Sequence, residues 1–216
     1  WTLYRTGLVS TFVRCLAVEP EHPDPLFCGT EDGVYLRTDG GVTWAQARSA
    51  PSVRSLAIHP IKTGVIYAGA YGDGVWKSVN GGKNWSLVNL GLTNLLVRTV
   101  ALHPSKPETL LAGAGTGGGI HRSLNGGLSW VQVPDTTATV GACVEIQYDR
   151  LDPLRVYAAE LDRGVLRSAD GGTTWARINR GLVSFRTRSL CVVDTLRYVG
   201  TEAGGAYFTT LNDTLW

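Results

Sequence analysis

Residues 167–175 read Arg-Ser-Ala-Asp-Gly-Gly-Thr-Thr-Trp, and versions of this stretch return along the 216-residue chain. Each version ends in tryptophan, and six tryptophans at positions 1, 44, 85, 130, 175 and 216 are separated by 43, 41, 45, 45 and 41 residues. Self-similarity at a fixed period predicts an array of repeated structural units. We therefore expect five units of similar structure.

Each unit carries the same order of short apolar segments. Unit two has Val53–Ile58, Val65–Ala70 and Gly74–Ser78, followed by a fourth segment that begins at Trp85. These segments are rich in β-branched and aromatic residues, are bounded by Gly, Pro, Asn and Asp, and lack helical spacing. The corresponding segments of the other units are Val13–Val18, Leu26–Thr30 and Gly33–Arg37; Val97–Leu102, Thr109–Ala114 and Gly119–Ser123; Cys143–Tyr148, Arg155–Glu160 and Gly164–Ser168; and Arg188–Val193 and Arg197–Thr201.

Four-stranded units of this length predict an all-β fold, a five-bladed β-propeller of antiparallel blades in which residues 1–216 form a single domain. The first and second strands are apolar on both faces because neighbouring blades cover both sides. An open array, or part of a larger propeller, is the alternative.

The termini predict how the ring closes. Residues 1–8 match residues 85–92 and 175–182, so they correspond to an outer, fourth strand without its own blade. Unit five ends in a worn copy of the repeat at Thr210–Trp216. We expect Trp1–Arg5 to pair beside Tyr207–Thr210, which would complete the last blade and remove two exposed strand edges.

The recurring Ser-x-Asp-x-Gly-x-Thr-Trp pattern resembles the Asp-box, or BNR, repeat of sialidases, sortilins, xyloglucanases and photosystem II assembly factors. The resemblance covers essentially the whole chain and implies that the box is a turn between the third and fourth strands of a blade. Its Asp or Asn oxygen can accept hydrogen bonds from the backbone of its own turn. The sequence departs from the pattern at Arg37 and at Asn212-Asp213. The structural box residues are Asp39, Trp44, Asn80, Trp85, Asn125, Trp130, Asp170 and Trp175.

Composition narrows the classes of partner. The chain has a net charge of +2 with both signs dispersed, which gives no reason to expect nucleic acid as a partner. It has no apolar run long enough for a membrane span. Its histidines and cysteines show no metal-ligand spacing, so we expect no metal and no cofactor. His59 and His103 are expected to be solvated loop residues.

An arginine recurs at the head of the first strand. Arg14, Arg54, Arg98 and Arg188 occupy one aligned position, where unit four has Val144. In a propeller the first strands line the central channel, so these guanidinium groups would ring its mouth, with Tyr71 and the glycine-rich loop 113–119 at the rim. Guanidinium suits capture of carboxylate, sulfate or phosphate. Alternatively each arginine pairs with a nearby acid, for which Glu31, Asp32, Asp73, Glu160, Asp162 and Glu202 are the candidates.

The cysteines leave two interpretations open. If Val18 lies opposite residue 25, then Cys15 lies opposite Cys28 at a distance compatible with a disulfide. The other interpretation is two small buried thiols.

We expect a non-catalytic, monomeric binding or scaffold module whose arginine-lined mouth takes an acidic ligand or a protein segment. The alternative is a carbohydrate-active enzyme, either a sialidase or another glycoside hydrolase, or a lectin-like propeller. Glycosidases need two carboxyl groups roughly 5–10 Å apart, and the spacing of the candidate acids fixes no such pair.

Overall fold

The computed structural model describes residues 2–19, 24–38, 40, 42–134, 141–210 and 215–216. In this part of the chain the structure is built from strands that form five antiparallel sheets, each corresponding to one predicted blade. The sheets are β1(Val13–Val18), β2(Leu26–Thr30), β3(Gly33–Arg37) and β4(Ala45–Ser49); β5(Val53–Ile58), β6(Ile66–Ala70), β7(Gly74–Ser78) and β8(Ser86–Leu87); β9(Val97–Leu102), β10(Leu110–Ala114), β11(Ile120–Ser123) and β12(Val131–Gln132); β13(Ala142–Tyr148), β14(Val156–Leu161), β15(Gly164–Ser168) and β16(Ala176–Arg177); and β17(Thr187–Val193), β18(Leu196–Thr201) and β19(Gly205–Thr210).

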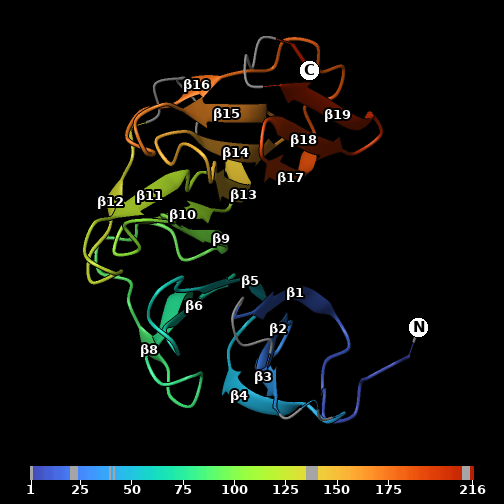
Figure 1. Cartoon of the computed structure of the whole chain (residues 1–216), viewed down its shortest axis with the longest axis vertical. Helices are drawn as coiled ribbons and strands as arrows, with labels where there is room; N and C mark the ends of the chain where they lie inside the picture. Colours follow the sequence, from blue (N-terminus) through green and yellow to red (C-terminus); the bar gives the residue numbers. More distant parts are fainter. Residues whose placement is uncertain (1, 20–23, 39, 41, 135–140, 211–214) are drawn as a thin grey trace.

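The five sheets follow one another in an arc, with β1, β5, β9, β13 and β17 on its inner side (Figure 1). Apolar side chains fill the spaces between successive sheets: Phe27 packs with Val53, and Leu111 packs with Cys143. Both faces of a second strand are therefore covered, and every residue of β6 and β10 is buried. The predicted apolar character of these strands on both faces is confirmed for the internal sheets.

The box turns are held by their own side chains. Ser168 Oγ accepts the N–H of Gly172 at 2.8 Å, and Asp170 Oδ1 accepts the N–H of Thr174 at 2.8 Å. Gly172 needs its positive φ of 86° to turn the chain back, and glycine adopts this conformation without steric cost. The boxes of the second and third sheets form the same bonds through Asn80 and Asn125. Asp39 of the first box lies outside the described residues.

Trp130 fastens its unit to the preceding one, whereas the indole N–H of Trp85 donates to Gly82 O at 2.9 Å within its own turn. Trp130 donates its backbone N–H to Leu90 O at 2.8 Å and its indole N–H to Val88 O at 2.7 Å, both in the preceding unit. Trp44, Trp130 and Trp175 are buried, whereas Trp85 is half-buried.

The N-terminal segment makes this same connection. Trp44 donates its backbone N–H to Thr6 O at 2.8 Å and its indole N–H to Tyr4 O at 3.1 Å. The segment 2–8 is therefore hydrogen-bonded to the box of the first sheet. The described part of the fifth sheet has three strands, β17, β18 and β19. The prediction that Trp1–Arg5 completes the last blade beside Tyr207–Thr210 is wrong for the described residues 2–5, which form no strand and pair with no strand of the fifth sheet, because the opening of the arc separates the two sheets; Trp1 lies outside the described residues.

The arc is open between its first and last sheets. Figure 1 shows β1 and the β17–β19 sheet on the two sides of one opening, with the start of the chain running outward from the first sheet. The predicted repeat order and strand order are confirmed, but the ring is not closed in this structure.

Candidate functional site

A β-bulge lies at the head of every inner strand. In β5, Val53 pairs with Ala70 and Ser55 pairs with Gly69, so Arg54 is an extra residue without a partner in the ladder. A bulge re-aims the side chain of the inserted residue and bends the strand locally. The register shifts at the same place in the other inner strands, where the inserted residues are Arg14, Arg98, Val144 and Arg188. The aligned arginine position of the sequence is therefore a bulge position.

Arg54 and Arg98 meet on one aromatic ring. The guanidinium carbon of Arg54 lies 4.5 Å from the centre of the Tyr71 ring, and that of Arg98 lies 5.0 Å from it. The N–H of Tyr71 donates to Ser52 O at 3.0 Å, and Tyr71 also forms an isolated β-bridge with Leu96, so its backbone is held between the second sheet and the segment that leads into the third. A ring that contacts two cations offsets part of their mutual repulsion through its negative face. Tyr71 thus holds two like charges close together.

Both guanidinium groups retain an unused donor. The Nε atoms of Arg54 and Arg98 are buried and have no hydrogen-bond partner among the described residues. Burial, and then the charges of Arg98 and Arg14, lower the pKa of Arg54, although an arginine in a protein stays protonated. The cluster Arg54–Tyr71–Arg98 therefore carries two positive charges and two Nε–H donors that no described residue accepts from.

Arg14 adds a third charge, which is already neutralised. Its Nε donates to Glu31 Oε1 at 2.5 Å, and this hydrogen bond from Arg14 holds the pKa of the Glu31 carboxyl below its usual range. The charge of the Glu31 carboxylate thus acts on Arg54 together with the charges of two other guanidinium groups, those of Arg14 and Arg98. The excess charge favours an anion.

Arg188 belongs to a different group. It pairs with Glu202, and its neighbour Arg186 donates to Asp162 Oδ1 at 2.9 Å. The hydrogen bond from Arg188 lowers the pKa of Glu202. The predicted set of four arginines is therefore divided: three lie on the first three sheets, Val144 interrupts the row, and Arg188 is paired in the fifth sheet.

The remaining candidate acids are mostly engaged within their own sheets. Asp32 accepts from Thr30 Oγ1 at 2.6 Å and from the Tyr35 hydroxyl at 2.7 Å. Glu160 is buried and accepts from the Arg177 guanidinium at 2.8 Å. Five of the six acids therefore have hydrogen-bond partners, the sixth being Asp73, which lies in the β6–β7 hairpin.

Of the two interpretations of Cys15 and Cys28, the structure has the free thiols and not the disulfide, because the register is offset by one residue. Val18 pairs with Leu26 rather than with residue 25, so Leu16 lies opposite Cys28 and Cys15 lies opposite Gly29. A one-residue offset moves a side chain to the other face of the sheet. Both cysteines are free, and burial raises the pKa of Cys15 to about 12 and that of Cys28 to about 11.

The loop histidines are buried rather than solvated. His59 Nδ1 accepts the N–H groups of Ile61 and Lys62 at 3.1 and 2.9 Å, and His103 Nδ1 accepts that of Lys106 at 3.1 Å. Asp149 caps the equivalent loop of the fourth sheet through the N–H of Leu151 at 2.9 Å. The prediction of solvated histidines is wrong because these rings replace a capping carboxylate.

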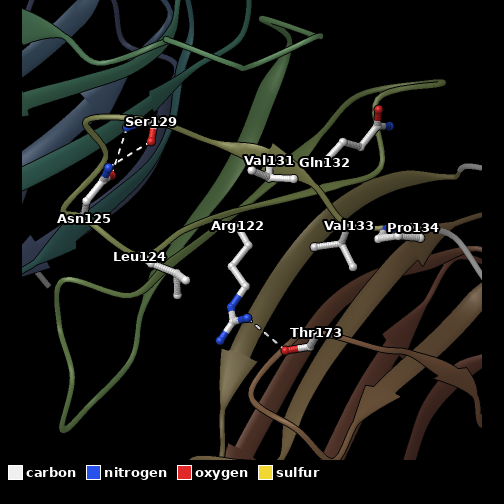
Figure 2. Close-up of a pocket in the computed structure, with 9 residues that line it drawn as sticks. All are labelled: Arg122, Leu124, Asn125, Ser129, Val131, Gln132, Val133, Pro134 and Thr173. Carbon is white, nitrogen blue, oxygen red and sulfur yellow. Dashed lines mark hydrogen bonds between the residues drawn. The ribbon is translucent and has the colours of Figure 1, made fainter.

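A cavity lies on the outer rim of the arc, beside the box turn of the third sheet. Figure 2 shows Arg122 beneath β12 with its Nη1 donating to Thr173 Oγ1 at 2.9 Å. The cavity has a volume of about 270 Å³, and its lining residues include Leu124, Val131 and Val133. Lys77 occupies the equivalent position in the second sheet and donates to Gly126 O at 2.9 Å. We therefore interpret Arg122 as a link between neighbouring sheets.

Comparisons with known proteins define the fold. No protein-family model and no curated protein match the sequence. Among solved structures, an ancestral GH74 enzyme matches 98% of this chain with a TM-score of 0.81 and 20% identity. The GH74 xyloglucanase from Xanthomonas campestris matches 100% of it with a TM-score of 0.72 and 18% identity. YCF48 bound to D1 peptide matches 97% of it with a TM-score of 0.71 and 14% identity.

The chain has the β-propeller fold. It spans 31% and 38% of the two GH74 chains and 68% of the YCF48 chain. At these identities the likeness concerns the fold of the propeller alone. Within the described ranges, the propeller contains no helix long and apolar enough to cross a membrane, and no cluster of three or more potential metal ligands.

Proposed function

We propose that this propeller is a non-catalytic binding module whose Arg54–Tyr71–Arg98 cluster takes up an acidic protein segment. The observation that carries the proposal is the pair of buried Nε–H groups on Arg54 and Arg98, which have no acceptor among the described residues. A buried donor without an acceptor is costly, and a carboxylate would supply one to each arginine. The aromatic ring between them offers an apolar contact for the same segment.

A peptide suits this place better than a small sugar. The cluster lies at the heads of two neighbouring inner strands, where Arg54 and Arg98 are the inserted residues of their bulges and both contact Tyr71. YCF48, which has a similar fold, is solved with a peptide bound. Hydrolysis of a glycoside would need two available carboxyl groups, whereas most of the candidate acids already accept hydrogen bonds.

The test is binding of an Asp/Glu-rich synthetic peptide by the intact chain, compared with the Asn/Gln version of the same peptide. The double variant Arg54→Ala/Arg98→Ala should weaken binding of the acidic peptide about 100-fold or more, since each of the two charge-assisted hydrogen bonds contributes about 1.5–3 kcal/mol. Added salt should weaken binding by the native chain.

Arg188→Ala is the matched control, because Arg188 occupies the same bulge position but is paired with Glu202. It should leave peptide affinity within about twofold, since an exposed ion pair contributes little. Equal losses in the control and the double variant, or equal binding of the acidic and neutral peptides, would contradict the proposal. Phosphate that binds as tightly as the peptide would reassign the cluster to a small anion.

A further inference from the structure

The first sheet exposes a surface that every later sheet covers. Leu16 of β1 is 60% exposed; at its repeat position Leu56 is partly buried, and Val100, Ile146 and Leu190 are 5%, 4% and 3% exposed. Those three pack against the preceding sheet, as Leu190 does against Tyr157. Val18, two residues on, is 43% exposed. We name Leu16 and Val18 the leading flank.

The fifth sheet exposes the complementary surface. Tyr198 of β18 is 41% exposed, whereas the residues at its repeat position are fully buried against the next sheet. Phe208, which pairs with Tyr198 across β18 and β19, is 61% exposed, and the two ring centroids are 6.2 Å apart. We name Tyr198 and Phe208 the trailing flank. The residues at the repeat position of Tyr198 are Phe27, Tyr67, Leu111 and Tyr157.

The glycines of the second strands also show that the internal sheets are covered and that the fifth sheet is not. A Cβ added at Gly69 would lie 2.9 Å from Val97 of the next sheet, and one added at Gly113 would lie 2.9 Å from the Cβ of Cys143 of the next sheet. At Gly200 of β18 the nearest atoms belong to Ser189 of the same sheet. The trailing flank thus has the backbone shape that receives a neighbouring inner strand.

The first sheet already holds a segment that corresponds to the end of an outer strand. The backbone of Tyr4 and Thr6 accepts the two N–H groups of Trp44, as the segment 88–90 that follows β8 does for Trp130. Leu8 packs on the cluster of Cys28, Tyr35 and Trp44. Residues 2–8 therefore lie where the outer strand of a preceding blade leaves its sheet.

We propose that the leading and trailing flanks together are a docking surface for further blades of this same repeat, which bridge the opening of the arc. The occupant presents an aliphatic inner strand to Tyr198 and Phe208, and an aromatic second strand to Leu16 and Val18. Both flanks border one opening (Figure 1), so blades that fill the opening would contact both of them. Continuity with the four internal contacts between sheets identifies the partner as a blade.

The experiment extends the full chain with its own repeats. Appending a copy of residues 86–174 after Trp216 supplies an outer strand for the fifth sheet, one complete blade, and three strands that residues 1–5 can complete. A shorter extension, a copy of residues 86–129, supplies one blade less. Leu16→Glu and Tyr198→Glu are then placed in the original part of each chain, and Leu87→Glu on the exposed outer strand β8 is the control.

We expect Leu16→Glu and Tyr198→Glu to lower the thermal midpoint of at least one extended chain by roughly 5–10 °C and to leave that of the 216-residue chain nearly unchanged. Leu87→Glu should have little effect in any chain. Small effects in all chains, or added blades that stay unfolded beside the intact five sheets, would overturn the proposal. A large drop in the thermal midpoint of the 216-residue variants would also overturn the proposal. If the drop is independent of protein concentration, the two flanks contact each other within one chain. If it grows with protein concentration, a second copy covers them.

Discussion

Single side chains fix the turns of this propeller. Asp170 accepts the N–H groups of Thr173 and Thr174 and the hydroxyl groups of Ser168 and Thr174. Although burial raises it, these hydrogen bonds bring the pKa of Asp170 down to about 2. Asn80 and Asn125 form the equivalent turns without a titratable group. The chain therefore offers an internal comparison between a charged box and neutral ones.

Acid should loosen the fourth box first. Since the folded pKa of Asp170 lies below that of an unfolded aspartate, its contribution is complete above about pH 4 and is lost as pH falls toward 2. We expect Asp170→Asn to remove this part of the acid dependence of the thermal midpoint, and Asp170→Ala to cost about 1 kcal/mol at pH 7, as loss of a capping side chain does. An unchanged pH profile for Asp170→Asn would contradict the assignment.

The buried histidines predict a second pH dependence at higher pH. Burial, and then Lys62, lower the pKa of His59, so the folded protein keeps the ring neutral while the unfolded chain takes up a proton. Stability should therefore fall as pH drops below about 6.5. His59→Asn keeps an acceptor for the N–H of Lys62 and should flatten the thermal midpoint between pH 7 and pH 5. A profile that stays as steep as that of the native chain would show that the ring is not the cause.

At the scale of elements, the close approach of neighbouring sheets depends on small residues in the second strands. A side chain at Gly113 would collide with Thr99 and Cys143, both within 3 Å of the added Cβ. We expect Gly113→Ala to cost about 1–3 kcal/mol, the usual cost of overpacking, in denaturant unfolding. Gly200→Ala meets only the rotatable hydroxyl of Ser189 and should cost clearly less. Equal costs would show that the fifth sheet is covered in solution.

Most strands could be predicted to within a residue because turn residues and apolar segments recur at fixed places, as for Val13–Val18 and Gly33–Arg37. The bulges could not be predicted, because an inserted residue leaves the apolar pattern of an inner strand unchanged. The pairing of Cys15 was mispredicted for a separate reason, because Val18 pairs with Leu26 where β1 leads into β2, and the bulge lies on the other side of Cys15. For the candidate site, the sequence indicated Arg54, Arg98 and Tyr71, but not that Tyr71 lies against both arginines while Arg188 is paired elsewhere.

At the scale of the whole molecule, the arc distributes its apolar contacts unevenly. The three middle sheets are covered on both sides, whereas β1 and β17–β19 border the opening (Figure 1). Stability in stacked repeats is carried by contacts between neighbours, so the end sheets should open locally most often. Hydrogen–deuterium exchange should be slowest in β6, β10 and β14 and faster in β1, β18 and β19. Uniform protection across the five sheets would contradict the open arc.

The fastening of Trp130 by residues 88–90 also bears on how such a chain can lengthen by duplication. A unit that runs from one box tryptophan to the next contains the outer strand of one sheet and the three inner strands of the following sheet. When such a unit is copied, each sheet at the seam is shared between old and new polypeptide. Backbone hydrogen bonds of one sheet then join the old polypeptide to the duplicated one at every junction. A newly duplicated repeat is therefore bonded to its neighbours before its side chains have adapted to them.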